Sequence, residues 1–253
     1  IVFVCIFANV LVPEELVTAY DAGAMLSPPS AEHWFGTDNL GRDLFARVIY
    51  GARITVGIGV GATLVSLVIG AAIASICALF KKADLVIMRV IDVVTCVPSI
   101  LLALVLLAIM GGSVLNMMVT LTIVSVPGFV LRIRSVLLGV VDQDYIHAAR
   151  VSGTRPLKLV LRHILPNAID PIIVDATMTI SSMMLSAAGL SFIGVGVAPP
   201  APEWGAMLNY AQDYFKTAPY MALFPGAAIA LTALSINLVG DGLRDALDPK
   251  TGK

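Results

Sequence analysis

Residues 54–80 read ITVGIGVGATLVSLVIGAAIASICALF and contain no charged side chain. A helix of about 20 residues crosses the roughly 30 Å hydrocarbon core of a membrane, so this run is long enough to span it. The whole chain has the same character, because 58% of its 253 residues are hydrophobic and 13% are charged. Lipid admits helices or closed barrels, and the short alternating segments of a barrel are not seen. We therefore predict an all-α membrane protein.

Further apolar stretches predict additional spans. Residues 93–131, 176–198 and 217–240 are uncharged, and the Gly111-Gly112-Ser113 turn divides the first of these into two helices. The apolar opening, residues 1–12, is interpreted as the end of a clipped first helix. Six transmembrane helices are expected, at 1–12, 54–80, 85–110, 114–134, 169–197 and 218–240.

Three regions follow from this division of the chain. Residues 1–53 hold the clipped first helix and an external segment, and residues 54–240 form the transmembrane domain. A polar loop at 138–168 lies within that domain, and residues 241–253 form a C-terminal tail. With six crossings, both termini lie on the same side of the membrane as the 138–168 loop.

Basic residues are distributed unequally between the two sides. One side receives Lys81, Lys82, Arg89, Arg132, Arg134, Arg150, Arg155, Lys158, Arg162, Arg244, Lys250 and Lys253. The other side receives Arg42, Arg47, Arg53 and Lys216. Because cytoplasmic loops carry the excess of lysine and arginine, we predict that the 138–168 loop and both termini are cytoplasmic.

Several classes of function lack their sequence signals. The net charge of −1 gives no indication of nucleic-acid binding, and Cys5, Cys77 and Cys96 lie apart in apolar stretches that suggest neither a disulfide framework nor a metal site. The chain has no phosphate-binding Gly-x-x-x-x-Gly-Lys-Ser/Thr loop and no His-Glu-x-x-His motif, and Gly189-Leu-Ser191 lacks the closing glycine of a nucleophile elbow. We predict no catalytic residue, no metal and no cofactor bound by this chain.

The most informative segment is the polar stretch 142–167, DQDYIHAARVSGTRPLKLVLRHILPN. Acidic residues precede a short helix at 145–151, Gly153 ends it, and Pro156 opens a second helix that runs to residue 164. Ala148 and Ala149 keep the first helix surface low, so that another protein can approach its backbone closely. Arg150 offers a guanidinium fork for carboxylates.

This segment resembles the cytoplasmic coupling loop of binding-protein-dependent ABC transporter permeases, whose pattern is Glu-Ala-Ala, three residues, Gly, and later Leu-Pro. His147 stands where the family often has Glu, and it is interpreted either as a solvated histidine or as a pH-sensitive contact. The resemblance implies a type I ABC importer permease fold. It also implies contact with ATPase subunits through Asp144, Tyr145, His147, Ala148, Ala149, Arg150, Gly153, Arg162, Leu165 and Pro166.

Three other stretches are similar to the dipeptide, oligopeptide and nickel branch of that family. They are Phe35-Gly-Thr-Asp-Asn-Leu-Gly-Arg-Asp43, Leu190-Ser-Phe-Ile-Gly194 and Asn237-Leu-Val-Gly-Asp-Gly-Leu-Arg-Asp-Ala-Leu-Asp-Pro249. The resemblance implies peptide import by alternating access in a prokaryotic inner membrane, with nickel or metal-chelate import as the alternative. Its implied partners are a second homologous permease, two ATP-binding subunits that carry ATP and Mg, and an extracytoplasmic substrate-binding protein.

The fifth predicted helix is soft and polar for a transmembrane segment. Met178, Ser182, Met183 and Ser186 are candidates for lining the pathway, because methionines and hydroxyls adapt to varied side chains. Ordinary helix packing is an equally good interpretation of these residues. An ion-coupled secondary transporter is less favoured, since neither an inverted repeat nor a chain of intramembrane charges is evident.

Overall fold

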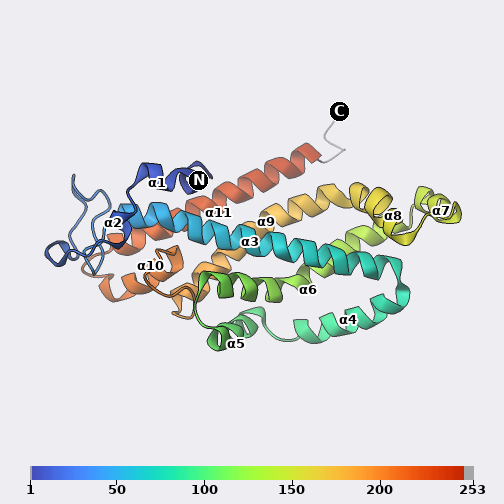
Figure 1. Cartoon of the computed structure of the whole chain (residues 1–253), viewed down its shortest axis with the longest axis horizontal. Helices are drawn as coiled ribbons and strands as arrows, with labels where there is room; N and C mark the ends of the chain where they lie inside the picture. Colours follow the sequence, from blue (N-terminus) through green and yellow to red (C-terminus); the bar gives the residue numbers. More distant parts are fainter. Residues whose placement is uncertain (1, 248–253) are drawn as a thin grey trace. The chain divides into compact units, whose positions relative to one another are not determined.

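The computed structural model describes residues 2–247, and the regular secondary structure of that range is helical, apart from one isolated bridge between Thr37 and Asp43 (Figure 1). The α-helices in chain order are α1 (Val2–Leu11), α2 (Glu15–Thr18), α3 (Leu44–Leu79), α4 (Lys81–Thr95), α5 (Ser99–Met110), α6 (Val114–Val141), α7 (Asp144–Val151), α8 (Pro156–Leu159), α9 (Leu165–Phe192), α10 (Trp204–Ala211) and α11 (Tyr220–Leu247). Short 3₁₀ turns lie at Ala22–Ala24 and Gln212–Tyr214, and a π-helical turn, η2, lies at Val160–Ile164. The predicted all-α class is confirmed.

Four helices of the described chain are long and apolar enough to cross a membrane: Leu44–Leu79, Val114–Val141, Pro156–Phe192 and Tyr220–Leu247. The first of them contains 36 residues. At about 1.5 Å per residue, it is much longer than the roughly 30 Å apolar core. Its first turns therefore belong to the predicted external segment.

The third predicted span differs from the expected single helix at 85–110. It consists of α4 and α5, which are bent by 82° at a break of a few residues, so this pair counts either as one broken span or as a re-entrant loop. Pro98 lies in the break. Proline has no backbone N–H and disfavours the helical conformation of the residue before it, here Val97, so the helix ends at this point.

The helices at the two ends of the chain match the predicted boundaries to different degrees. Helix α1, Val2–Leu11, lies within the 1–12 range that was predicted for the end of the first helix. Helix α11 continues past the predicted boundary at residue 240 and ends at Leu247. The first seven residues of the predicted 241–253 tail are therefore helical, and residues 248–253 of that tail lie outside the described part of the chain.

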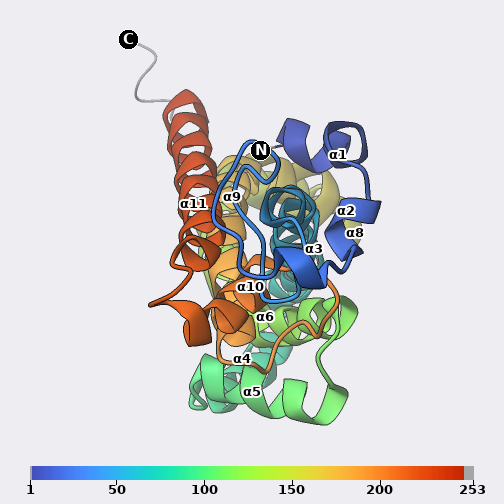
Figure 2. The same cartoon turned by 90° about the vertical axis from the view of Figure 1, so that its left-hand side faces the viewer.

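The chain forms two compact units, each assembled from segments that are distant in sequence. The first unit contains residues 1–61, 104–121 and 180–236. Its apolar core joins the start of α3 to α9, α10 and α11, with Met184, Ala188, Trp204 and Ile229 among the buried side chains. Figure 2 looks onto the end of this unit that carries α2, α10 and the segment leading into α3.

Close backbone packing in the first unit depends on glycine. A Cβ atom on Gly205 would lie 2.3 Å from the carbonyl oxygen of Ala188, and one on Gly51 would lie 2.3 Å from that of Pro202. Real Cβ atoms do not approach backbone so closely, so α10 contacts α9 only because residue 205 has no side chain. Small residues permit this kind of contact where helices pack in lipid.

Among the described residues, the second unit contains 62–103, 122–179 and 237–247. Arg134 of α6 binds Asp84 of α4 in a bidentate ion pair, with Nε–Oδ1 and Nη2–Oδ2 distances of 2.5 and 2.7 Å. Arg132 Nε lies 2.8 Å from Asp175 Oδ2 on α9, and its guanidinium lies over the ring of Phe129. These pairs connect α4 and α9 to α6 by charge-assisted hydrogen bonds.

Candidate functional site

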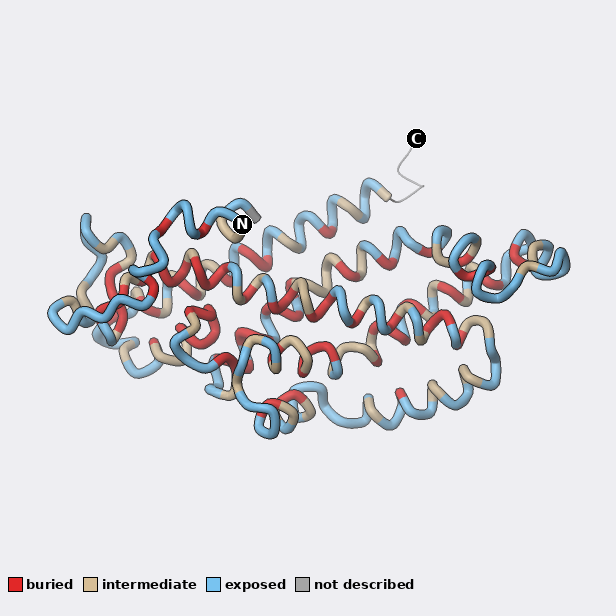
Figure 3. The backbone as a smooth tube through the Cα atoms, in the orientation of Figure 1, coloured by how far each residue is buried: buried red, intermediate tan, exposed pale blue. Residues whose placement is uncertain are grey.

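Helix α7 lies on the surface of the second unit and is attached to it through a single buried side chain. Ile146 is fully buried, whereas Ala149 is half-buried and the other six residues of α7 are exposed (Figure 3). Asp144 occupies the first turn and Arg150 the last, so the charges at both ends oppose the helix dipole favourably. The helix is therefore well formed, yet it presents most of its surface outward.

A complete Schellman motif ends α7 at the predicted glycine. The N–H of Gly153 donates to the carbonyl of Arg150 at 3.1 Å, and the N–H of Thr154 donates to the carbonyl of Ala149 at 3.2 Å. Gly153 has φ of +78°, and a Cβ atom there would meet nothing within 4 Å. Glycine is favoured here because of its left-handed backbone conformation, and space is available for a side chain.

The second predicted short helix does not end at residue 164 but continues into α9. Pro156 lies in the first turn of α8, as its lack of an N–H favours. The five-residue π-helical turn η2 then leads into α9, where Pro166 lies in the first turn. Such turns occur mostly as single insertions in α-helices and are frequent at functional sites.

The predicted coupling residues all lie at the surface of the loop, apart from its buried side chains. Leu159 and Ile164 are buried and, together with Ile146, are the largest of the fully buried side chains of the 138–168 loop. The predicted contact residues are all exposed or half-buried, and none belongs to this buried set: Asp144, Tyr145, His147, Ala148, Ala149, Arg150, Gly153, Arg162, Leu165 and Pro166. Their role in coupling stays a prediction.

Large apolar side chains are exposed on the same loop. Tyr145 is 45% exposed, Leu161 60%, Leu157 71% and Val151 90%. Leu157 and Leu161 lie at the start of the Pro156–Phe192 candidate span, whereas Tyr145 and Val151 belong to α7, which is outside the candidate spans. Exposed apolar side chains on α7 are typical of a protein contact.

The four candidate pathway residues do not share one environment on α9. Ser182 and Ser186, four residues apart, are exposed, and the Ser186 hydroxyl donates to the Ser182 carbonyl at 2.8 Å. Met178 is half-buried, whereas Met183 is buried although it lies only about 60–100° around the helix from the two serines. The geometry is compatible with a pathway role for the serines, but it places Met183 in packing.

A buried polar network in the first unit was not anticipated from the sequence. Glu203 is fully buried and caps α10: its carboxylate accepts from the N–H groups of Gly205 and Ala206 at 3.0 and 2.8 Å. The Thr55 hydroxyl donates to Glu203 Oε1 at 3.2 Å and accepts from the N–H of Trp204 at 3.1 Å. An acidic residue directly before a helix start is the only sequence signal for this cap.

Within residues 2–247, no group of three or more His, Cys, Asp or Glu side chains is arranged to hold a metal ion.

The sequence matches a family of transport proteins over most of its length. Residues 66–253 match the family described as "Binding-protein-dependent transport system inner membrane component", which is most of the chain. The chain belongs to this family. The dipeptide transport system permease protein DppC of Alkalihalophilus pseudofirmus is 40% identical over 250 residues, which cover 98% of this permease and 82% of the relative. The glutathione transport system permease protein GsiD of Escherichia coli O6:K15:H31 is 42% identical over 251 residues, which cover 99% and 83%.

Two solved ABC transporter structures have a fold similar to that of this chain. A structure of the inward-facing MetNI methionine ABC transporter matches 80% of this permease and 97% of that chain, with a TM-score of 0.68 and 17% sequence identity. An amino acid ABC transporter with histidines matches 81% and 94%, with a TM-score of 0.60 and 21% identity. The predicted ABC importer permease fold is thereby confirmed.

Proposed function

We propose that this permease forms the peptide pathway of an ATP-driven importer, and that the loop at 138–168 transmits the motion of separate ATPase subunits to the helices. The observation that carries the proposal is helix α7, which is capped at Gly153, anchored by Ile146 and otherwise exposed. A short helix held by one apolar side chain can move as a body while it stays attached to its neighbours. Hydrolysis of ATP, with its Mg, belongs to the partner subunits in this scheme.

The distribution of charge supports a cytoplasmic position for this loop. Among the described residues, the first unit contains four lysines and arginines: Arg42, Arg47, Arg53 and Lys216. The second unit contains ten: Lys81, Lys82, Arg89, Arg132, Arg134, Arg150, Arg155, Lys158, Arg162 and Arg244. Under the positive-inside rule, the 138–168 loop lies on the cytoplasmic side and the segment leading into α3 lies outside.

The partners follow from the same arrangement. ATPase subunits contact the α7 surface, an external binding protein delivers the solute to the first unit, and a second homologous permease completes the pathway. The names of the two relatives, a dipeptide permease and a glutathione permease, support short peptides as the solute. The exposed serines of α9 offer hydroxyl groups that bind peptide amides without selecting a particular side chain.

The substrate proposal is tested by uptake into liposomes that contain the whole transporter with its binding protein. We expect ATP-dependent accumulation of a labelled dipeptide or of glutathione, and none when ATP is replaced by a non-hydrolysable analogue. Labelled nickel serves as the comparison solute. Accumulation of nickel in place of peptide contradicts the peptide assignment and favours the metal-chelate alternative. Uptake without ATP contradicts the mechanism as a whole.

The Schellman motif provides a test of coupling. Gly153→Val places a β-branched residue at φ of +78°, which costs about 1–2 kcal/mol or more for an L-residue and weakens the end of α7. We expect a loss of ATP-driven uptake of about tenfold, measured as initial rate per assembled complex. Gly153→Asn is the matched control, because asparagine tolerates the left-handed region, and it should retain most of the uptake. Equal rates for the two variants would show that the cap of α7 does not matter for coupling.

A further inference from the structure

Two arginines form ion pairs with the carboxylate of Asp38. Asp38 and Arg42 lie just before α3, and Arg47 lies in its first turn. Arg42 Nε lies 2.7 Å from Asp38 Oδ2, and Arg47 Nε lies 3.4 Å from the same oxygen. The three side chains are buried, with exposed fractions of 9% for Arg42, 3% for Arg47 and 6% for Asp38. Guanidinium groups stay charged in proteins, so the cluster carries one positive charge more than its carboxylate neutralises.

The neighbouring acceptors do not supply the missing negative charge. The other oxygen of Asp38 accepts from the N–H groups of Leu40 and Arg42, and Arg47 Nη1 donates to the neutral carbonyl of Val17 at 3.0 Å. Asp43, the next carboxylate along the chain, binds His33 and the N–H of Ala46 instead. A buried charge without a counter-charge costs several kcal/mol, so this cluster favours an additional anion.

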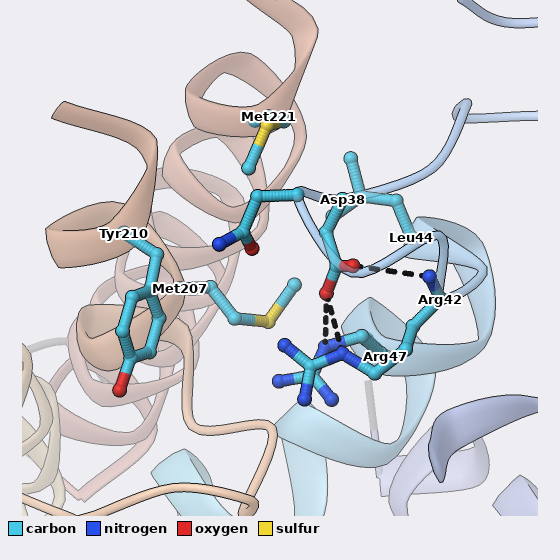
Figure 4. Close-up of a pocket in the computed structure, with 8 residues that line it drawn as sticks. Asp38, Arg42, Leu44, Arg47, Met207, Tyr210 and Met221 are labelled. Atoms are coloured by element: carbon cyan, nitrogen blue, oxygen red, sulfur yellow. Dashed lines mark hydrogen bonds and ion pairs between the residues drawn. The ribbon is translucent and has the colours of Figure 1, made fainter. Parts of the chain in front are cut away.

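A small cavity lies beside the two guanidinium groups. Its volume is about 10 Å³, which is room for one particle of about the size of a water molecule. Asn39, Leu44, Met207, Tyr210 and Met221 complete the wall, and Asp38 is the only carboxylate among the described residues that line it. Figure 4 shows both guanidinium groups on the same side of Asp38, with their terminal nitrogens directed away from its carboxylate.

We propose that this cavity binds one halide-sized anion, such as chloride, held by Arg42 and Arg47. The anion completes the charge balance of the cluster and fastens the segment before α3 to α10 and α11, which provide Met207, Tyr210 and Met221. Charge-assisted hydrogen bonds from guanidinium groups are about twice as strong as neutral ones, so a halide is favoured over water in this position. The cavity is too small for a phosphate or a peptide.

The first test is thermal unfolding of the assembled transporter in nanodiscs while sodium chloride replaces sodium gluconate at constant ionic strength. Ligand binding to the folded state predicts a saturable rise of about 2–4 °C in the unfolding temperature. Arg42→Gln leaves Asp38 paired with Arg47 alone, so the chloride dependence should disappear while the cluster remains neutral. Arg53→Gln is the control, because Arg53 lies in α3, as Arg47 does, but not in the cavity wall, and the chloride dependence of this variant should match that of the wild type.

Asp38→Asn changes the charge of the cluster in the opposite direction, because it removes the carboxylate and leaves both arginines. The amide oxygen can still accept from Leu40 and Arg42, but both guanidinium groups lose their counter-charge. This variant should unfold earlier than the wild type in gluconate and gain more from chloride. The proposal is overturned if the wild type shows no chloride dependence, or if Arg42→Gln keeps it.

Diffraction locates the anion without any variant. Crystals of the assembled transporter grown in sodium bromide should show an anomalous peak between Arg42, Arg47 and Tyr210. The absence of a peak at that position overturns the proposal, even if both variants fail to assemble.

Discussion

Replacing Ile146 by alanine is expected to abolish most ATP-driven uptake while the permease still inserts and assembles. Ile146 is fully buried and is the only buried residue of α7, so the helix has no second apolar anchor. Truncation of a buried isoleucine to alanine costs about 2–5 kcal/mol. Because the loss is confined to one short helix, we expect α7 to detach locally before the remainder of the chain unfolds. Initial rates of uptake, normalised to assembled complex, measure the functional effect.

Hydrogen exchange separates anchoring from contact with the ATPase. Amides of α7 should exchange much faster in Ile146→Ala than in the wild type, and Ile146→Val, which costs about 0.5–1.5 kcal/mol, should lie between them. Val151→Ala is the matched control on the same helix, since Val151 is 90% exposed and its loss should leave exchange unchanged. Normal uptake in Ile146→Ala, together with fast exchange, would remove α7 from the coupling mechanism.

The sequence predicted the existence of the helices better than their limits. Hydropathy reports transfer from water into lipid, and it therefore locates residues 54–80 correctly, but it does not report that α3 begins earlier, at Leu44. The ten residues before position 54 include two arginines, Arg47 and Arg53, which lower the mean hydropathy of this stretch. Both bind partners in the folded chain, Arg47 at Asp38 and Arg53 at the carbonyl of Ile6. Asp38 precedes Arg47 by nine residues and Ile6 precedes Arg53 by 47, so neither partner enters a hydropathy average as a partner.

The bend between α4 and α5 shows a different limit. The absence of charge from residue 93 to the Gly111-Gly112-Ser113 turn favours one continuous helix up to residue 110, but the helix breaks at Pro98. Proline inside a helix is tolerated elsewhere in this chain, at Pro127 in α6 and Pro225 in α11. The local sequence therefore does not distinguish a proline that ends a helix from one that is accommodated. Neighbouring helices decide between the two, because they can satisfy the freed carbonyl groups.

The loop at 138–168 was predicted more fully because its signals are local. Gly153 ends α7 through its own backbone conformation, and Pro156 begins α8 through its missing N–H, so short-range chemistry is sufficient. The face of α9 was less predictable. Ser182 and Met183 are adjacent in sequence, yet Ser182 is exposed and Met183 is buried, and only the packing of other helices fixes which side is covered.

Replacing Glu203 by alanine is expected to have a large effect on the stability of the first unit. The carboxylate is fully buried and accepts three hydrogen bonds, two of which come from the first N–H groups of α10. Loss of a helix cap costs about 0.5–2 kcal/mol, and each buried donor left without an acceptor costs a further 1–3 kcal/mol. We expect destabilisation of about 3 kcal/mol or more, seen as a lower unfolding temperature and a lower yield of assembled transporter.

Thr55 allows this effect to be divided into its parts. Thr55→Val removes one hydrogen bond to Glu203 and the acceptor for the Trp204 N–H, but it leaves both N–H contacts of the α10 cap in place. If the network acts as a unit, the Thr55→Val and Glu203→Ala losses combined in one chain should be smaller than their sum. Asn209→Ala is the control, because its side chain donates to the carbonyl of Phe192 from an exposed position and should cost little. Strictly additive losses would mean that Thr55 and Glu203 stabilise the first unit independently and do not act as one network.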